Sequence, residues 1–126
     1  MPDSPQAAVE SMLTALDAGD RDTVAAGFSD DAQGIDEISC RWLRGRDQMN
    51  EYIDGIFDAT ANVTSAITDV HVADLGDGAL VTGILNQSYD LDGDRQQISV
   101  PTTFALRRAE DGWLICLFHS VPVSAD

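Results

Sequence analysis

Apolar residues recur at helical spacing in the first part of the chain. One stripe has members at i, i+3, i+4 and i+7, namely Val9, Met12, Leu13 and Leu16. Ser4 followed by Pro5 is typical of a helix start, because serine caps well and proline suits the first helical position. Gly19 is typical of the position just after a helix. The pattern therefore predicts a first helix between Ser4 and Gly19.

Two further helices are predicted before residue 60. Asp20 is placed to cap a short second helix, with Val24 and Phe28 facing inward and residues 29–31 ending it. The third helix carries the most regular apolar stripe, formed by Met49, Tyr52, Ile53, Ile56 and Phe57. Between these two helices, residues 33–40 indicate a short strand.

After Thr60 the pattern changes to that of strands. Four β-rich segments follow, at residues 63–75, 79–91, 96–108 and 113–121. Each connection contains an Asp-Gly pair, which is a strong hairpin signal because both residues tolerate positive φ. The pattern predicts a four-stranded antiparallel meander, in which Pro101 requires a sheet edge or a bulge. Strands this long should twist and curl.

The last segment is apolar on both faces. Strict alternation places Trp113, Ile115, Leu117 and His119 on one face. The same alternation places Leu114, Cys116, Phe118 and Ser120 on the other face. Because both faces are mostly apolar, we expect one to face helices and a pocket and the other a second subunit.

The order of elements predicts an α+β fold made of one domain over residues 1–126. We expect three helices packed on a strongly curved, mostly antiparallel sheet of four long strands plus a short one. Helices laid across the concave side of such a sheet would enclose a cone, and the interior of that cone is the natural pocket.

Charge narrows the choice of partners. The formal net charge is −15, with 22 acidic residues against seven basic ones, all of them arginine. Such a surface repels nucleic acid and anionic lipid, so we expect neither as a partner. Cys40 and Cys116 have apolar neighbours in the sequence, and we therefore expect both to be reduced residues of the core. With no leader and no long apolar run in this sequence, we expect a cytoplasmic protein.

Five short segments together resemble nuclear transport factor 2-like proteins. They are ALDAGD at 15–20, FSDDA at 28–32, LRGRD at 43–47, LGDGALVTG at 75–83 and RRAEDGWLI at 107–115. The resemblance spans about residues 7–121 and is greatest to the SnoaL-like and ketosteroid-isomerase-like branch, with similarity to calmodulin-kinase association domains. It implies a cystatin-like cone that forms a homodimer through its sheet. It does not imply one function, because members include enzymes and non-catalytic modules.

Asp36 and His119 are the candidate catalytic residues. The resemblance places Asp36 where ketosteroid isomerases carry their catalytic base, which moves a proton between carbons. The isomerase's oxyanion donors are not matched, since Met12 and either Thr102 or Thr103 stand at those positions. His119 could act as a base or orient a ligand, or be an ordinary core or interface histidine.

Six further residues are candidate ligand contacts in the cone: Met12, Trp42, Tyr52, Phe57, Tyr89 and Phe104. Arg44 and Arg46 could attract an anion, but we favour hydrogen bonding at the start of the third helix. The acidic loop at 90–94 lacks the spacing of a calcium site and indicates a hairpin turn. We expect no metal and no cofactor.

Two functions remain open from the sequence. In the first, the cone binds a small hydrophobic or polyketide-like molecule, with or without cofactor-free acid–base catalysis of the isomerase, cyclase or hydrolase type. In the second, the protein is a non-catalytic association or ligand-binding module that acts through its dimerising sheet face. Convergence of Asp36 and His119 on one ligand atom would favour the enzyme.

Overall fold

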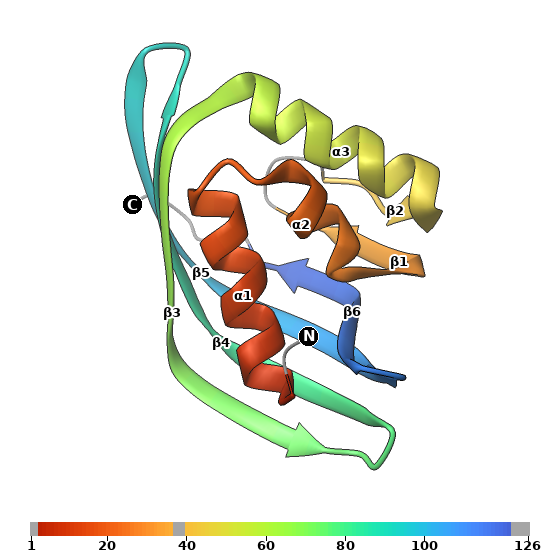
Figure 1. The fold of residues 1–126 in the computed structure, drawn as a ribbon. Helices are drawn as coiled ribbons and strands as arrows, with labels where there is room; N and C mark the ends of the chain where they lie inside the picture. Colours follow the sequence, from red (N-terminus) through yellow and green to blue (C-terminus); the bar gives the residue numbers. More distant parts are fainter. Residues whose placement is uncertain (1–2, 37–39, 122–126) are drawn as a thin grey trace.

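Six strands form one curved sheet in the order β2-β1-β6-β5-β4-β3, and three helices lie inside its curve (Figure 1). The computed structural model describes residues 3–36 and 40–121. The helices are α1 (Pro5–Asp17), α2 (Arg21–Ala26) and α3 (Gly45–Ala59). The strands are β1 (Phe28–Ile35), β2 (Leu43–Arg44), β3 (Thr60–Asp74), β4 (Gly78–Leu91), β5 (Asp94–Ala109) and β6 (Gly112–Ser120). The predicted α+β class is confirmed, although β1 and β2 take the place of the one short strand.

The predicted helix ends are confirmed where they depend on local chemistry. The Ser4 hydroxyl accepts a hydrogen bond from the Ala7 backbone N–H at 3.1 Å and caps α1, which Pro5 begins. Gly19 follows α1 with a φ of 73°, in the left-handed region that favours glycine. The Asp20 carboxylate caps α2 by accepting from the Thr23 N–H at 3.3 Å.

The predicted end of α2 is wrong. The helix stops at Ala26, and Phe28 begins β1, so residues 29–31 lie in a strand. The reason is long-range pairing, because β1 runs parallel to β6 and the Ile115 N–H donates to the Gly27 carbonyl at 2.9 Å. The strand expected at 33–40 therefore begins five residues earlier, and its residues 37–39 lie outside the described residues.

The meander of β3 to β6 is confirmed, with antiparallel pairing throughout. Asp92 and Gly93 have φ values of 53° and 86°, as the two central residues of a type I′ hairpin turn require. Pro101 lies in β5 one residue beyond its last pair with β6, Thr102 opposite Ser120. The Pro101 carbonyl accepts a hydrogen bond from the Val121 N–H, just past the end of β6. In an antiparallel strand the nitrogen of the same residue points to the same side, so the missing N–H of Pro101 leaves no bond to β6 unmade.

A bulge in β6 changes which residues face the helices. Ala105 of β5 pairs with Leu117, while the next residue, Leu106, pairs with Ile115, so Cys116 has no partner in the register. Such an extra residue inverts the alternation of all side chains that follow it. Consequently the buried side is formed first by Trp113 and Ile115 and then by Phe118 and Ser120. The predicted division of this strand into two faces is wrong after Ile115.

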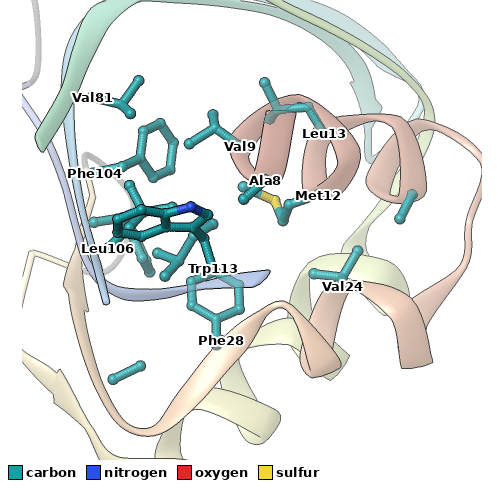
Figure 2. Packing of buried hydrophobic residues seen from close by; sticks show 14 of the residues in the cluster. Ala8, Val9, Met12, Leu13, Val24, Phe28, Val81, Phe104, Leu106 and Trp113 are labelled. Carbon is teal, nitrogen blue, oxygen red and sulfur yellow. The ribbon is translucent and has the colours of Figure 1, made fainter. Parts of the chain in front are cut away.

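The core lies between α1 and the concave face of the sheet. Val9, Met12 and Leu13 of α1 face Val81, Phe104 and Trp113 of the strands (Figure 2). Burying side chains of this size contributes roughly 1.5–3 kcal/mol each. Cys40 is not part of this core: it is exposed, contrary to the sequence prediction, whereas Cys116 is half-buried at the bulge.

Candidate functional site

A cavity of about 120 Å³ lies between the helices and the concave face of the sheet. Its described lining is mostly apolar, with a few polar groups. The lining residues are Met12, Leu13, Leu16, Val24, Phe28, Asp36, Tyr52, Ile53, Ile56, Phe57, Thr60, Val63, Leu85, Gln87, Tyr89, Thr102, Phe104, Phe118 and Ser120. A dry apolar cavity of about 150 Å³ can hold a benzene molecule, so this smaller cavity suits at most the single ring of a ligand.

The partly exposed lining residues show where the cavity meets solvent. Leu16 lies in the last turn of α1, Ile56 and Phe57 lie in the last turn of α3, and Val63 lies near the start of β3. The residues at the other end, including Thr102 and Phe118, are buried. The cavity therefore opens near the ends of two helices and extends towards the middle of the sheet.

Asp36 is the charged side chain of the described lining. It follows β1 and is 9% exposed. Tyr52, from the middle of α3, donates its hydroxyl hydrogen to Oδ2 of Asp36. The Tyr52 ring stacks on the Phe118 ring, with centroids 5.7 Å apart, so helix, strand and carboxylate form one packed unit. The aromatic stack holds the Tyr52 hydroxyl in position and thereby orients the carboxylate.

A second polar group lies deeper in the cavity. The hydroxyls of Thr102 in β5 and Ser120 in β6 are 3.0 Å apart, and that of Thr102 also donates to the Val100 carbonyl at 3.1 Å. A hydroxyl has a single hydrogen, so satisfying both contacts requires Ser120 to donate to Thr102. The oxygen lone pairs of this pair remain available to accept hydrogen bonds.

Most of the predicted ligand contacts line the cavity, but one does not. Met12, Tyr52, Phe57, Tyr89 and Phe104 are all among its walls. Trp42 lies outside and is 43% exposed. Its ring is 6.2 Å from the His119 ring and 5.5 Å from the Arg44 guanidinium, so it belongs to the surface beside β6.

His119 does not line the cavity, and the expectation that it shares a face with Trp113 and Ile115 is wrong. The bulge at Cys116 turns His119 to the outer face of the sheet, where it is exposed and lies opposite Thr103 of β5. Asp36 and His119 therefore point into different environments. They cannot act on the same ligand atom in this arrangement.

Sequence reasoning did not name many of the lining residues, and four of them show why. Phe118 and Ser120 were assigned to the opposite face, because no residue type at Cys116 announces a bulge. Gln87 could have been found, since strict alternation in β4 places it on the face of Leu85 and Tyr89. Val63 lies between Ala61 and Thr64 of β3, where the register shifts, so alternation gives no guide there.

Arg44 and Arg46 form hydrogen bonds that connect the start of α3 to neighbouring elements. Arg46, in the first turn of α3, donates to the carbonyls of Ala25 and Phe28 at 2.7 Å each and so joins α3 to the end of α2. Arg44 donates to the Gln33 side chain at 3.0 Å. Hydrogen bonding at the start of the third helix, which we favoured for these two residues, is confirmed.

Three surface carboxylates have a lowered pKa. Hydrogen bonds from Arg107 and then Ser29 lower the pKa of Asp31, and the hydrogen bond from Arg21 lowers that of Asp54. For Asp90 the pKa is lowered by hydrogen bonds from Asn62 and then Arg95. None of these ion pairs touches the described lining of the cavity.

Within residues 3–36 and 40–121, no group of three or more His, Cys, Asp or Glu side chains is arranged to hold a metal ion. In the same ranges, no helix is long and apolar enough to cross a membrane. The acidic loop at 90–94 forms the hairpin between β4 and β5, as predicted.

The sequence matches the model of the SnoaL-like domain over residues 6–124. The chain belongs to the SnoaL-like domain family. The suspected membership of the nuclear transport factor 2-like superfamily is thereby confirmed. No curated protein matched the sequence significantly.

Solved structures share the fold of this SnoaL-like domain. A candidate dehydratase of the NTF2-like family from Streptomyces avermitilis is 26% identical, with a TM-score of 0.83 over 94% of this chain and 93% of that one. A candidate calcium/calmodulin-dependent protein kinase II association domain from Xanthomonas campestris is 21% identical (TM-score 0.84, 96% and 86%). A ketosteroid isomerase-like protein from Erwinia carotovora atroseptica is 22% identical (TM-score 0.79, 94% and 93%). The last two similarities show only that the fold is shared.

Proposed function

We propose that this SnoaL-like domain, a single unit over residues 1–126 acting in the cytoplasm, binds a small, largely apolar molecule in its cavity. The observation that supports this most directly is the Asp36–Tyr52 pair, a carboxylate held in place in a mostly apolar cavity. Binding sites of this kind use a few placed polar groups to orient a ligand and an apolar wall to hold it. Asp36 would contact the polar end of the ligand.

Asp36 is also the proposed catalytic residue, acting as a proton carrier. A dehydration suits one carboxylate: Asp36 takes a proton from carbon, the C–H electrons form the double bond, and the acid returns the proton to the leaving hydroxyl. Water departs and the carboxylate is regenerated. The likeness at 26% identity to the candidate dehydratase supports this reaction class. An isomerisation would need a hydrogen-bond donor to stabilise the enolate oxygen. Tyr52 is a poor donor for this purpose because it already gives its hydrogen to Asp36.

A fragment screen by ligand-observed NMR tests the binding proposal. Val63→Trp should abolish binding, because the indole would occupy the open end of the cavity at a partly exposed strand position. Val72→Trp is the matched control, since it lies on the same strand, is 47% exposed and is outside the lining. Fragments that bind both variants equally, or none that binds the wild type, would remove the cavity as the functional site.

The second candidate function is self-association through the outer face of the sheet. Half-buried Leu80, Ile84, Leu114 and Leu117 project from this face of β4 and β6, on the side away from the helices. Exposed apolar area of this kind is typical of an interface. The solved structures of similar fold include a CaMKII hub and association domains, which is in keeping with a homodimer of this chain.

Analytical ultracentrifugation tests the homodimer. Leu117→Glu should shift the protein from dimer to monomer, because two buried carboxylates would face each other across a two-fold interface. Ala59→Glu, on the exposed side of α3, should leave the dimer intact. A wild-type protein that sediments as a monomer at 100 µM, on the order of the loading used in such experiments, would refute this function.

A further inference from the structure

The chemistry of the cavity indicates the class of its ligand. Resting on the binding part of the proposed function, and giving Asp36 the role of an anchor in place of a proton carrier, we propose that the ligand is a cationic amine with an aromatic or other apolar body, held with its ammonium group at Asp36. Three independent properties of the described lining support this: the sign of its charge, the direction of its hydrogen bonds and its aromatic content.

The charge of the lining is negative. Asp36 is its charged group, and among the described lining residues there is no arginine or histidine. The chain as a whole carries −15, so the potential at the cavity opening attracts cations and opposes anions. A ligand carboxylate or phosphate would meet like charge both on approach and at the end of the cavity. An ammonium group would meet opposite charge at both stages.

The hydrogen bonds of the cavity leave acceptors for a ligand. Tyr52 has committed its hydrogen to Asp36. Thr102 has committed its hydrogen to the Val100 carbonyl, and Ser120 has committed its hydrogen to the Thr102 hydroxyl. What these groups can offer a ligand is carboxylate and hydroxyl oxygen, and an ammonium group is all donor. Of the other polar lining residues, Thr60 donates to the Ile56 carbonyl at 2.7 Å and Gln87 gives one of its amide hydrogens to Ser65 at 3.0 Å, so a carbonyl or carboxylate ligand would meet fewer donors than acceptors.

Aromatic rings supply the third property. Six line the cavity: Phe28, Tyr52, Phe57, Tyr89, Phe104 and Phe118. The faces of such rings attract cations by about 0.5–2 kcal/mol, and more strongly when water is excluded. A carboxylate in a cavity lined by several aromatic rings therefore favours an amine over a neutral molecule of the same shape, and both over an anion.

A matched series of three compounds tests the proposal. Benzylamine, benzyl alcohol and benzoate have nearly the same shape and differ in charge at neutral pH, and their single ring suits a cavity of about 120 Å³. Titration followed by 1H–15N NMR should give an amine affinity at least tenfold above that of the alcohol, with the acid weakest. The shifted amides should surround the cavity, including those of Tyr52 and Val63.

Variants separate the cavity from the surface charge. In Asp36→Asn the preference for the amine over the alcohol should fall below threefold, while Asp58→Asn, an exposed carboxylate on α3, should keep it. The preference should also persist at 0.5 M salt, where surface attraction is screened. An alcohol or acid that binds the wild type as tightly as the amine overturns the amine proposal but leaves the cavity as a binding site. A preference that survives in Asp36→Asn overturns it equally, because surface charge would then be its source. If none of the three binds, the proposed function fails together with it.

Discussion

Gly34 in β1 is a position where one added methyl group should damage the protein. A Cβ atom built on Gly34 would lie 2.1 Å from Cε1, 2.4 Å from Cζ and 2.6 Å from Cδ1 of Phe118. Ordinary contacts between carbon atoms are about 3.5–4.0 Å, so the Phe118 ring must move by more than roughly 1 Å. The ring has little room, since it is 8% exposed and packs against both Phe28 and Tyr52.

The expected cost follows from this crowding. Overpacking of a core position costs about 1–3 kcal/mol, and the depth of the overlap places Gly34→Ala at the upper end, about 2–3 kcal/mol. For a chain of this length, each kcal/mol lowers Tm by about 3–5 °C, so we expect a fall of roughly 6–15 °C in a thermal melt followed by circular dichroism. The displaced ring would also disturb Tyr52, so affinity for a cavity ligand should fall.

Two comparisons make the test decisive. Gly55→Ala is the matched control: nothing lies within 4 Å of its Cβ position in α3, so it should raise stability by about 0.5–1 kcal/mol through helix propensity. Phe118→Leu should relieve Gly34→Ala, with the double variant more stable than the sum of the single effects by at least about 1 kcal/mol. A melting temperature of Gly34→Ala within about 2 °C of the wild type, or additive effects in the double variant, would refute the reasoning.

Three further predictions concern stability, pH and reactivity. Arg46→Met should lower the free energy of unfolding in urea by about 2–3 kcal/mol, since two charged hydrogen bonds to main-chain carbonyls are lost; a change below about 0.5 kcal/mol would contradict this. The pKa of Asp31 is lowered in the folded state by Arg107, so its contribution is present above the unfolded value of about 4 and is lost as pH falls further. Arg107→Ala should therefore raise the pKa of Asp31 in a carboxyl 13C titration and reduce the loss of stability below pH 4, whereas an unchanged pKa would exclude the pairing. Burial raises the pKa of the Cys116 thiol, so iodoacetamide at pH 8 should modify exposed Cys40 faster, and equal rates would show that Cys116 is accessible.

Much of the candidate site could be predicted from the sequence because its residues lie on regular elements. The stripe of α3 places Tyr52 and Phe57 inward, and the stripe of α1 does the same for Met12. Asp36 was identified through the resemblance to a known family. Its neighbours in the sequence give no sign that its side chain enters a cavity. Its partner, the Tyr52 hydroxyl, depends on how α3 lies against β1, and no local pattern encodes that.

The features that could be predicted from the sequence are those that local chemistry controls, namely helix ends and turns. Ser4, Gly19 and Asp20 mark helix ends through caps and backbone preference, and the Asp-Gly pairs join the strands into a meander. The tertiary structure alone decided the rest. Because β1 pairs with β6, Phe28 lies in β1 and not in the second helix. Because of the bulge at Cys116, His119 lies on the outer face of the sheet and Ser120 lines the cavity. Strand register depends on partners distant in the chain, and since side chains alternate with a period of two, one extra residue reverses every position after it.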